Sequence, residues 1–505
     1  MNATQQLTSL EPGMIIPVGG DRYTQVDADL AAAFQPGDRL YSVQDTGVLL
    51  HVPAAVHEAV TLQVDAAASA FEQLRSTRRE QIAEFYRAFA ANLTASWPQI
   101  AAANVDDEQR AKAAGRSTTR LVVSEKTRDE MVAGLQGWAE RVEHELATGA
   151  GNEIGRVDHD DWNVRIVTAP LGVIAFVFEG RPNVLADAAG VVATGNTAVL
   201  RIGSDALATA QAICETSLDP ALQQAGLPAG TISLIPVRER SAGWALFSDR
   251  RLALAVVRGS GRAVTELSSV ARQSGIPVSA HGTGGAWMIA DSSADGARFG
   301  AAVRHSLDRK VCNTLNVAVV VADRAEELIP VLLGAADQAA AARGGVARLH
   351  VASGSEGWLP ADVFTTTIEV KRAAGVVEEP RATLLPVHRL GTEWEWEDTP
   401  EISIVVVDGL EQAAGLFNSY SPHFVASLIA EDATAQARFR ALVDAPFLGD
   451  GFTRWVDGQY ALDQPELGLS NWERGRLLAR GGVLTGADLT TRQLFAHHDD
   501  PQQHR

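Results

Sequence analysis

The chain of 505 residues contains only two cysteines, Cys214 and Cys312. Two thiols in so long a chain exclude a disulfide framework and indicate a reducing compartment. Basic residues are also scarce, since 43 Lys and Arg stand against 62 Asp and Glu and give a formal net charge of -19. This excess of negative charge disfavours nucleic acid or an anionic membrane as a partner, although it does not exclude a local basic pocket.

Long apolar runs and targeting signals are missing as well. No apolar run approaches the length of a transmembrane helix, and the N-terminal MNATQQ lacks the basic region and apolar core of a signal peptide. With 46% hydrophobic and 21% charged residues, the composition is that of an ordinary globular protein, long enough for two or three domains. We therefore expect a cytoplasmic protein with no membrane and no nucleic-acid partner.

The second cysteine lies in a segment that favours chemistry. Arg309 and Lys310 precede Cys312, and the apolar run 317–321 after it predicts a buried strand. A thiolate is a nucleophile, and nearby positive charge lowers the pKa of a thiol. The segment alone fits a small buried cysteine equally well. Cys214, on an expected helix, is most simply part of the core.

The pattern of the chain changes along its length. Residues 1–55 read as an N-terminal extension of unknown role, with a hairpin over 40–52, and apolar stripes at helical spacing follow to about residue 147. From about residue 164, strands alternate with helices, which predicts a parallel, doubly wound sheet. The expected strands are 171–178, 197–201, 231–235 and 252–257.

Ligands of such sheets bind at the carboxyl ends of the strands. The turns after Phe178, Leu200 and Val257 are therefore candidate sites. The last of them, residues 258–262 (RGSGR), leads into an expected helix. Its glycines would let backbone N–H groups approach a phosphate, but the turn is not a complete dinucleotide fingerprint, and a plain tight turn would look the same.

Five segments occur in a characteristic order. They are EGRPNV at 179–184, GNTAVLRIGS at 195–204, GLPAG at 226–230, VCNTL at 311–315, and ARGG at 479–482 with LTT at 489–491. In these segments the chain resembles the gamma-glutamyl phosphate reductase (glutamate-5-semialdehyde dehydrogenase) family of the aldehyde dehydrogenase superfamily. The likeness spans about residues 56–494, and it is more specific for the family than for the substrate.

The resemblance implies an aldehyde dehydrogenase-like α/β fold with two doubly wound parallel-sheet domains plus an oligomerisation arm. A nicotinamide dinucleotide-binding domain would span residues 56–275, with a return of the chain at about 446–475. A catalytic cysteine domain would span 276–445, and 476–505 would form the oligomerisation arm and tail of a homo-oligomer. The pair His497-His498 in this tail most simply faces solvent, so no metal site is expected.

The resemblance also assigns the chemistry. Cys312 would attack an acyl phosphate, expel phosphate and form a thioester, which a nicotinamide hydride would reduce to the aldehyde. The side chain of Asn183 and the backbone N–H of Cys312 would donate to the oxyanion, and one such donor contributes roughly 3 kcal/mol of transition-state stabilisation. Without the family, Asn183 reads as a turn-capping residue.

A cofactor site follows from the same likeness. NAD-preferring relatives usually carry Glu at the position of Ser204, so its absence favours NADPH, although the neighbouring Asp205 tempers this preference. Arg201 and Ser204 would meet the adenosine ribose. The cofactor phosphates would meet the glycine-rich turn, made of Gly259, Ser260 and Gly261.

One absence separates two reaction types. Hydrolytic aldehyde dehydrogenases carry a Glu-Leu-Gly-Gly motif whose glutamate activates water, whereas residues 281–285 here read HGTGG and contain no carboxylate. A site without this base protects its thioester from water, which favours a reductase. The candidates to hold substrate and leaving phosphate are Arg181, Arg309, Lys310, Thr453 and Arg454. Alternatively, Arg309 and Lys310 bind no ligand and only face solvent on their loop.

Departures from the family keep the substrate open. The first 55 residues are extra, DRKVC at 308–312 lacks the usual Gln-Arg-Pro approach, and LGDGFTRW at 448–455 and YALDQPELG at 460–468 replace family segments that should line the pocket. We expect NADPH-dependent reduction of L-glutamate 5-phosphate, as in proline biosynthesis, with a possible acyl kinase partner. The alternatives are another acyl phosphate, an acyl-CoA or an aldehyde in a specialised pathway, or a non-catalytic binding protein.

Overall fold

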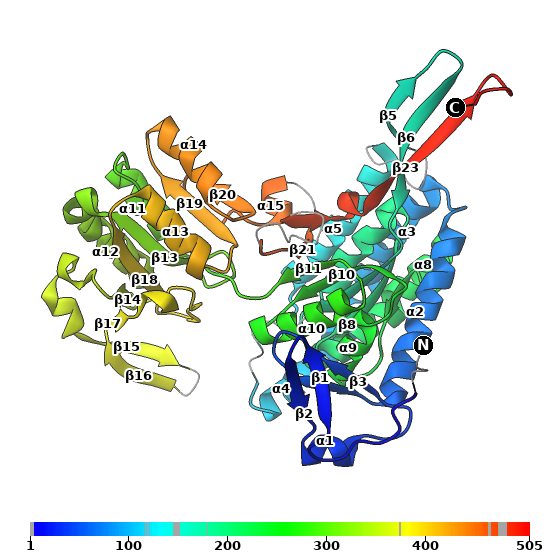
Figure 1. Cartoon of the computed structure of the whole chain (residues 1–505), viewed down its shortest axis with the longest axis horizontal. Coiled ribbons are helices and arrows are strands. Elements are labelled where there is room, and N and C mark those ends of the chain that lie inside the picture. Colours follow the sequence, from blue (N-terminus) through cyan, green and yellow to red (C-terminus); the bar gives the residue numbers. More distant parts are fainter. Residues whose placement is uncertain are drawn as a thin grey trace.

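The computed structural model describes residues 5–116, 118, 121–144, 152–178, 180–372, 375–462, 466–472 and 482–504. These residues form two lobes, each built on a parallel sheet, with a three-stranded arm projecting from the lobe that carries the N-terminus (Figure 1). Glu179, residues 463–465 and residues 479–481 of the ARGG segment lie outside the described residues. Among the described helices, none is long and apolar enough to cross a membrane.

The first lobe contains a five-stranded sheet of order β11-β10-β7-β8-β9, in which all neighbours are parallel. The chain starts at β7, proceeds outward through β8 and β9, and then returns to the other side of β7. The order therefore reverses between β7 and β10, and ligands of such sheets bind at this switch point. The strands are β7 (Val173–Phe178), β8 (Thr197–Ile202), β9 (Ile232–Leu234), β10 (Leu252–Arg258) and β11 (Val278–His281).

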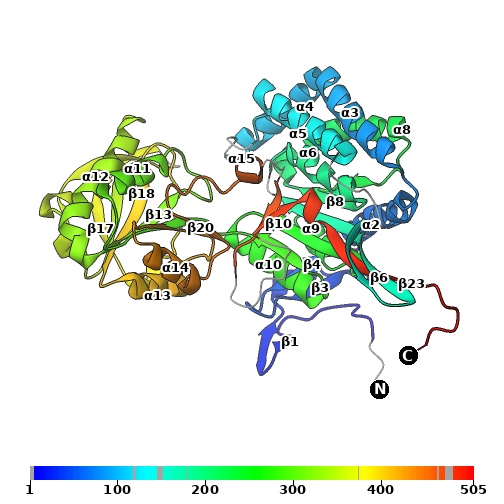
Figure 2. The ribbon, with the colours of Figure 1, turned by 90° about the horizontal axis from the view of Figure 1, so that it is seen from above.

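Successive residues of β7 enter two different cores, because strand side chains alternate between the faces of a sheet. Val177 packs with α2 (Ala54–Leu74), α9 (Ser241–Phe247) and α10 (Gly261–Gln273), whereas Phe176 packs on the opposite face. Figure 2 shows α3, α4 and α5 over this second face. Its helices are α3 (Arg79–Ala95), α4 (Trp97–Ala113), α5 (Glu125–His144), α6 (Val184–Ala188), α7 (Leu207–Ile213) and α8 (Asp219–Ala225).

The second lobe contains a seven-stranded, all-parallel sheet of order β17-β14-β18-β13-β12-β19-β20. Its central strand β13 alternates in the same way: Val320 packs under α11 and α12, and Val319 under α13 and α14. The doubly wound fold class is confirmed in both lobes. The elements are β12 (Ala286–Ala290), α11 (Gly296–His305), β13 (Leu315–Val321), α12 (Ala325–Ala341), β14 (Arg348–Ala352), β17 (Ala382–Leu385), β18 (Glu401–Val407), α13 (Leu410–Tyr420), β19 (Val425–Ile429), α14 (Ala433–Leu442) and β20 (Phe447–Gly449).

Short elements complete the chain. The arm is an antiparallel sheet of order β23-β6-β5, and the predicted hairpin over 40–52 is present as β3 and β4. Val43, Leu50 and Val52 belong to the core of the first lobe, so this part of the N-terminal segment is integral to that lobe. The elements are β1 (Ile15–Gly19), β2 (Arg22–Gln25), α1 (Ala28–Ala33), β3 (Arg39–Ser42), β4 (Leu49–Val52), β5 (Glu153–Asp158), β6 (Trp162–Pro170), β15 (Thr367–Arg372), β16 (Gly375–Pro380), α15 (Gly458–Leu462), β21 (Glu466–Leu469), β22 (Val483–Thr485) and β23 (Thr490–His498).

Two expected boundaries are wrong. The second unit does not begin near Ile276, because β11 pairs with β10 and completes the first sheet. The return to the first lobe does not begin at residue 446, because β20 pairs with β19 in the second sheet. Both strands are only three or four residues long, so their sequences carry too little pattern to show which sheet they join.

Trp138 fills a space between two glycines that are far apart in the sequence. A Cβ added to Gly190 would lie 2.9 Å from the Trp138 ring, and one added to Gly486 would lie 2.7 Å from it. The fully buried indole therefore joins α5, the segment after α6 and the approach to β23.

Gly190→Ala should lower the free energy of unfolding by about 1–3 kcal/mol, because overpacking displaces a rigid ring. The matched control is Gly134→Ala in α5, where an added Cβ meets nothing within 4 Å. That change should raise stability by up to about 1 kcal/mol, since glycine is unfavourable inside a helix. Denaturant and thermal unfolding measure both, and equal effects of the two substitutions would contradict this account of Trp138.

Candidate active site

A cleft of about 2240 Å³ lies where the carboxyl ends of β7 and β10 face the chain segments before β12 and β13. Of the residues expected to act, the cleft is lined by Arg181, Asn183, Gly259, Ser260, Gly261, Arg309, Lys310, Cys312 and Arg454. Arg201, Ser204 and Thr453 do not belong to its wall. The structure therefore gathers the expected nucleophile, the oxyanion donor and the glycine-rich turn in one place.

The loop before β13 is fixed by short hydrogen bonds. Thr314 Oγ1 donates to the Arg309 carbonyl at 2.6 Å and accepts from the Val311 N–H at 2.9 Å. The N–H of Gly285 donates to the Cys312 carbonyl at 2.7 Å. A Cβ on Gly284 would lie 2.7 Å from Cys312 Cα, so only glycine fits against the cysteine. The HGTGG segment and the cysteine loop are thus packed backbone to backbone.

A second loop is joined to the first through Asn313. Its side chain donates to the Val456 carbonyl at 2.9 Å and accepts from the guanidinium of Arg454, which also donates to Asp308 at 2.6 Å. Thr453 is fully buried and donates to the Asn313 carbonyl at 2.7 Å. The expectation that Thr453 contacts substrate is therefore wrong: its hydroxyl links the two loops.

The electrostatics of the thiol differ from the expectation. Burial raises the pKa of Cys312, Arg258 and Arg181 oppose this, and Glu466 and Glu393 add to it. The expected lowering of this pKa by the basic pair is wrong, because burial raises it. The Lys310 ammonium is 2.5 Å from Glu393 Oε1, which balances its charge, and Arg309 is exposed to solvent. The cations that favour the thiolate come instead from the first lobe.

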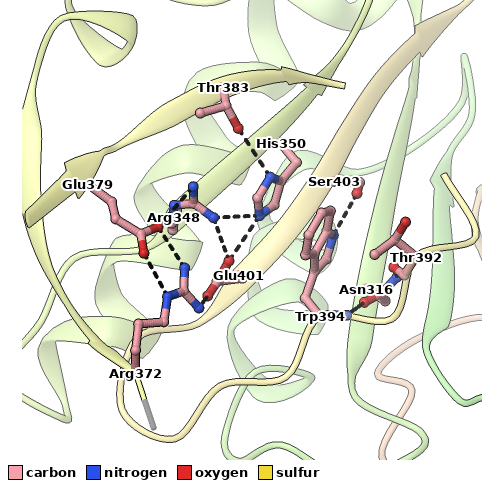
Figure 3. Close-up of polar contacts among 10 residues, drawn as sticks. All are labelled: Asn316, Arg348, His350, Arg372, Glu379, Thr383, Thr392, Trp394, Glu401 and Ser403. Carbon is pink, nitrogen blue, oxygen red and sulfur yellow. Dashed lines mark hydrogen bonds and ion pairs between the residues drawn. The ribbon is translucent and has the colours of Figure 1, made fainter. Parts of the chain in front are cut away.

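Glu393 connects three parts of the site. One carboxylate oxygen accepts a hydrogen bond from the Gly284 N–H at 2.6 Å, and the other accepts from the Lys310 ammonium group. The side chain of Asn316, in β13, donates to the Thr392 carbonyl at 2.8 Å and accepts from the Trp394 N–H at 3.0 Å. Figure 3 shows this amide bound to Thr392 and Trp394, the residues that precede and follow Glu393 in the sequence. The sequence contains no signal for this role, because an isolated Glu among Glu395 and Glu397 reads as a solvated surface.

Behind these contacts lies a buried charged cluster (Figure 3). The Trp394 indole donates to Ser403 at 2.9 Å and stacks on His350 with ring centroids 3.5 Å apart. His350 Nε2 donates to Glu401 at 3.0 Å, and burial lowers the pKa of the His350 imidazole although this hydrogen bond opposes the shift. The cluster is completed by ion pairs of Glu401 and Glu379 with Arg348 and Arg372.

His281 occupies the start of the HGTGG segment and is buried. Its Nδ1 donates to Asn471 Oδ1 at 2.7 Å, and the ring packs on Phe424. Burial, reinforced by the charge of Arg258, lowers its pKa to about 3. The imidazole is therefore neutral at physiological pH and a weak base.

The turn after β8 fits an anionic ligand. Arg116 pairs with Asp205 at 2.5 Å, and Arg238 donates to the Ser204 carbonyl at 2.8 Å. The carboxylate that would oppose a 2′-phosphate is thus balanced by a guanidinium. Arg201 lies at the same turn, and its buried Nε has no partner among the described residues. At the end of β10, which lies on the other side of β7, α10 begins at Gly261, where a Cβ would lie 2.9 Å from Thr283 Oγ1.

The sequence matches the model of the aldehyde dehydrogenase family over residues 39–345. The chain belongs to the aldehyde dehydrogenase family. It is 32% identical over 416 residues to the gamma-glutamyl phosphate reductase of Afipia carboxidovorans, covering 78% of this chain and 85% of that protein. The identity to the gamma-glutamyl phosphate reductase of Methylorubrum extorquens is 30% over 409 residues, covering 79% of this chain and 85% of the relative.

A solved structure, the gamma-glutamyl phosphate reductase of Thermotoga maritima, has the same fold with a TM-score of 0.73 and 23% identity, covering 88% of this chain and 100% of that chain. The resemblance to gamma-glutamyl phosphate reductases and the fold class expected from it are confirmed. This member of the aldehyde dehydrogenase family is an oxidoreductase, and its family uses NAD or NADP.

Glu393→Gln should make Cys312 more reactive. The change removes a negative charge that raises the pKa of the thiol and leaves the Lys310 ammonium unbalanced. A lower thiol pKa means a larger thiolate fraction, so alkylation by iodoacetamide should be severalfold faster at any pH below the pKa. The rate of alkylation against pH measures this directly. Glu397→Gln, on the same loop but paired with Lys371, is the control, and an unchanged profile in Glu393→Gln would refute the assignment.

Glu401→Gln should destabilise the second lobe by about 1–3 kcal/mol, because two half-buried guanidinium groups lose one of their two carboxylate partners and keep only Glu379. Burial acts against ionisation, but the hydrogen bonds from His350, Arg372 and Arg348 lower the pKa of Glu401 to about 2. Its contribution is therefore present above the unfolded-state pKa of about 4.5 and is lost as the pH falls towards 2. Unfolding midpoints from pH 6 down to 2 should fall less steeply in Glu401→Gln than in wild type, and parallel curves would count against this assignment.

Proposed function

We propose that the chain catalyses the NADPH-dependent reduction of gamma-glutamyl phosphate (L-glutamate 5-phosphate) to L-glutamate 5-semialdehyde, the activity named for its relatives. The observation that carries this proposal is that Cys312 and Asn183 line one cleft in which residues 281–285 offer no carboxylate to activate water. A thioester formed there does not meet the base that hydrolytic relatives carry in this segment, which favours its transfer to hydride.

In the proposed acylation, Cys312 sulfur forms a bond to the acyl carbon, the bond from that carbon to the phosphate oxygen breaks, and the thiol proton leaves with the phosphate as HPO₄²⁻. Asn183 and the Cys312 N–H stabilise the oxyanion of the tetrahedral intermediate. Arg258 and Arg181 favour the thiolate electrostatically. Their placement on the first lobe means that both lobes contribute to the nucleophile.

The leaving phosphate would meet Arg309 and Arg181. Arg309 is exposed at the cleft, and its guanidinium makes no hydrogen bond or ion pair with any residue that the structure describes. Lys310 and Arg454 are already bound to carboxylates of their own chain, so they contribute less to anion binding unless these pairs open.

In the proposed reduction, the turn after β8 with Arg201 and Ser204 holds the adenosine end of NADPH, and the glycine-rich turn 259–261 holds its phosphates. NADPH, when bound, supplies the hydride that reduces the thioester carbonyl. Asn183 stabilises the resulting oxyanion, whose collapse breaks the carbon–sulfur bond, returns the thiolate to Cys312 and releases the aldehyde. The neutral, weakly basic His281 leaves water near the thioester unactivated.

The same site could serve a different acyl donor. The segment 448–455, which departs from the family, is joined to the cysteine loop through Thr453 and Arg454. This observation favours another acyl phosphate as the second candidate.

We further propose that the protein is a cytoplasmic homo-oligomer and that it receives its labile substrate from an acyl kinase. The arm supports assembly, since it exposes Ile154, Val157, Leu494 and Phe495.

The reverse reaction tests the proposal. Wild type should reduce NADP⁺ with L-glutamate 5-semialdehyde only when phosphate is present, and Cys312→Ser should lose at least roughly 1000-fold in rate, since it removes the nucleophile. Absorbance at 340 nm follows the reaction.

Activity without phosphate would overturn the reductase assignment in favour of hydrolytic oxidation. Lack of activity on this aldehyde, combined with phosphate-dependent activity on other aldehydes, would select the second candidate.

A further inference from the structure

Asp187 lies one helical turn beyond the proposed oxyanion donor. Asn183 precedes α6 with helical backbone angles (φ -66°, ψ -17°), so residues 183 and 187 stand in an i, i+4 relation. Side chains at this spacing share a helix face with Cβ atoms about 5–6 Å apart. Both residues line the cleft. The helix thus presents an amide and a carboxyl to the same space.

Asp187 differs from the other acids of the cleft wall in having no partner. Its carboxyl group makes no hydrogen bond or ion pair with any residue that the structure describes. Each of the others is engaged, in the pairs Asp308–Arg454, Glu393–Lys310, Glu395–Lys310, Glu397–Lys371, Asp457 with the Tyr460 N–H, and Glu466–Arg258. A carboxyl group aimed into the cleft without a donor is suited to a ligand that brings one.

The surroundings make a cationic donor favourable. Burial raises the pKa of Asp187 to about 7, with Glu466 and Asp457 adding to the shift and Arg258 and Arg181 opposing it. A group withdrawn from water in this way ionises fully when a cation binds beside it. A positive ligand group beside Asp187 would therefore supply the partner that its carboxyl group lacks.

We propose that Asp187 binds the α-ammonium group of the substrate, so that the site selects acyl phosphates of amino acids over those of simple carboxylic acids. The identity of the substrate rests on the proposed function. In a glutamyl chain, four bonds separate the ammonium nitrogen from the reacting carbonyl carbon, or about 5 Å when extended. This length matches the 5.4 Å pitch of one helical turn. A carbonyl beside Asn183 therefore places the ammonium group at Asp187.

The test compares Asp187→Asn with wild type on L-glutamate 5-semialdehyde and on 5-oxopentanoate, which lacks only the amino group. Wild type should prefer the amino-acid aldehyde, and Asp187→Asn should lose about 10- to 100-fold of this preference through KM, because a charge-assisted hydrogen bond is lost. Asp187→Glu, which restores the charge, should recover part of it. Glu397→Gln, which changes an exposed acid of the same cleft that pairs with Lys371, should leave the preference unchanged.

Calorimetric binding of L-glutamate and glutarate gives a readout that needs no turnover. If wild type turns over the semialdehyde but Asp187→Asn keeps the full preference, this inference fails while the proposed function stands. If wild type shows no phosphate-dependent turnover yet binds glutamate over glutarate through Asp187, the proposed function fails and the inference stands. Equal binding of both ligands by wild type, with no turnover, overturns both.

Discussion

The site depends on the contact between the HGTGG segment and the cysteine loop. Gly285 donates to the Cys312 carbonyl at 2.7 Å, and Gly284 lies so close to Cys312 that no side chain fits. Because this segment leaves the carboxyl end of β11 in one lobe and enters β12 in the other, the same contact sets the position of the nucleophile relative to both sheets. The first lobe offers the carboxyl ends of its strands, as the rule for open sheets requires. The second lobe contributes Cys312, which lies in the loop before the amino end of β13.

Charge in the cleft is balanced pair by pair, and this determines how the thiol behaves. Lys310 is bound by Glu393 and Arg258 by Glu466, so neither cation acts alone on Cys312. A buried thiol beside two balanced pairs stays protonated in the resting site. Charged ligand groups then change this balance. An anion or a cation that binds beside these ion pairs shifts the pKa of the titratable groups next to it, including the Cys312 thiol.

The sequence predicted those parts of the fold that follow from local pattern. Buried apolar runs and their spacing identified β7, β8, β10 and β13, and the family motifs located Cys312 and Asn183. Residues whose roles depend on distant partners were missed. Glu393 acts only because Asn316, 77 positions earlier, fixes its backbone, and Thr453 was misassigned because its burial follows from packing. The pKa of Cys312 was misjudged for the same reason: sequence neighbours of a thiol need not be its electrostatic neighbours.

Protection of a thioester from water needs more than the loss of one carboxylate. The HGTGG segment, which stands where the resemblance places the Glu-Leu-Gly-Gly motif of hydrolytic relatives, begins with His281, and a histidine of ordinary pKa would be a competent base near neutral pH. Here the fold weakens this base, because burial and the charge of Arg258 disfavour the imidazolium and outweigh the hydrogen bond to Asn471, which acts in the opposite direction. The same Asn471 also donates to the carbonyls of Thr283 and Pro422. Asn471 therefore fixes the His281 ring and also holds the HGTGG segment against the second lobe, so the position of the imidazole and the assembly of the nucleophile depend on one side chain.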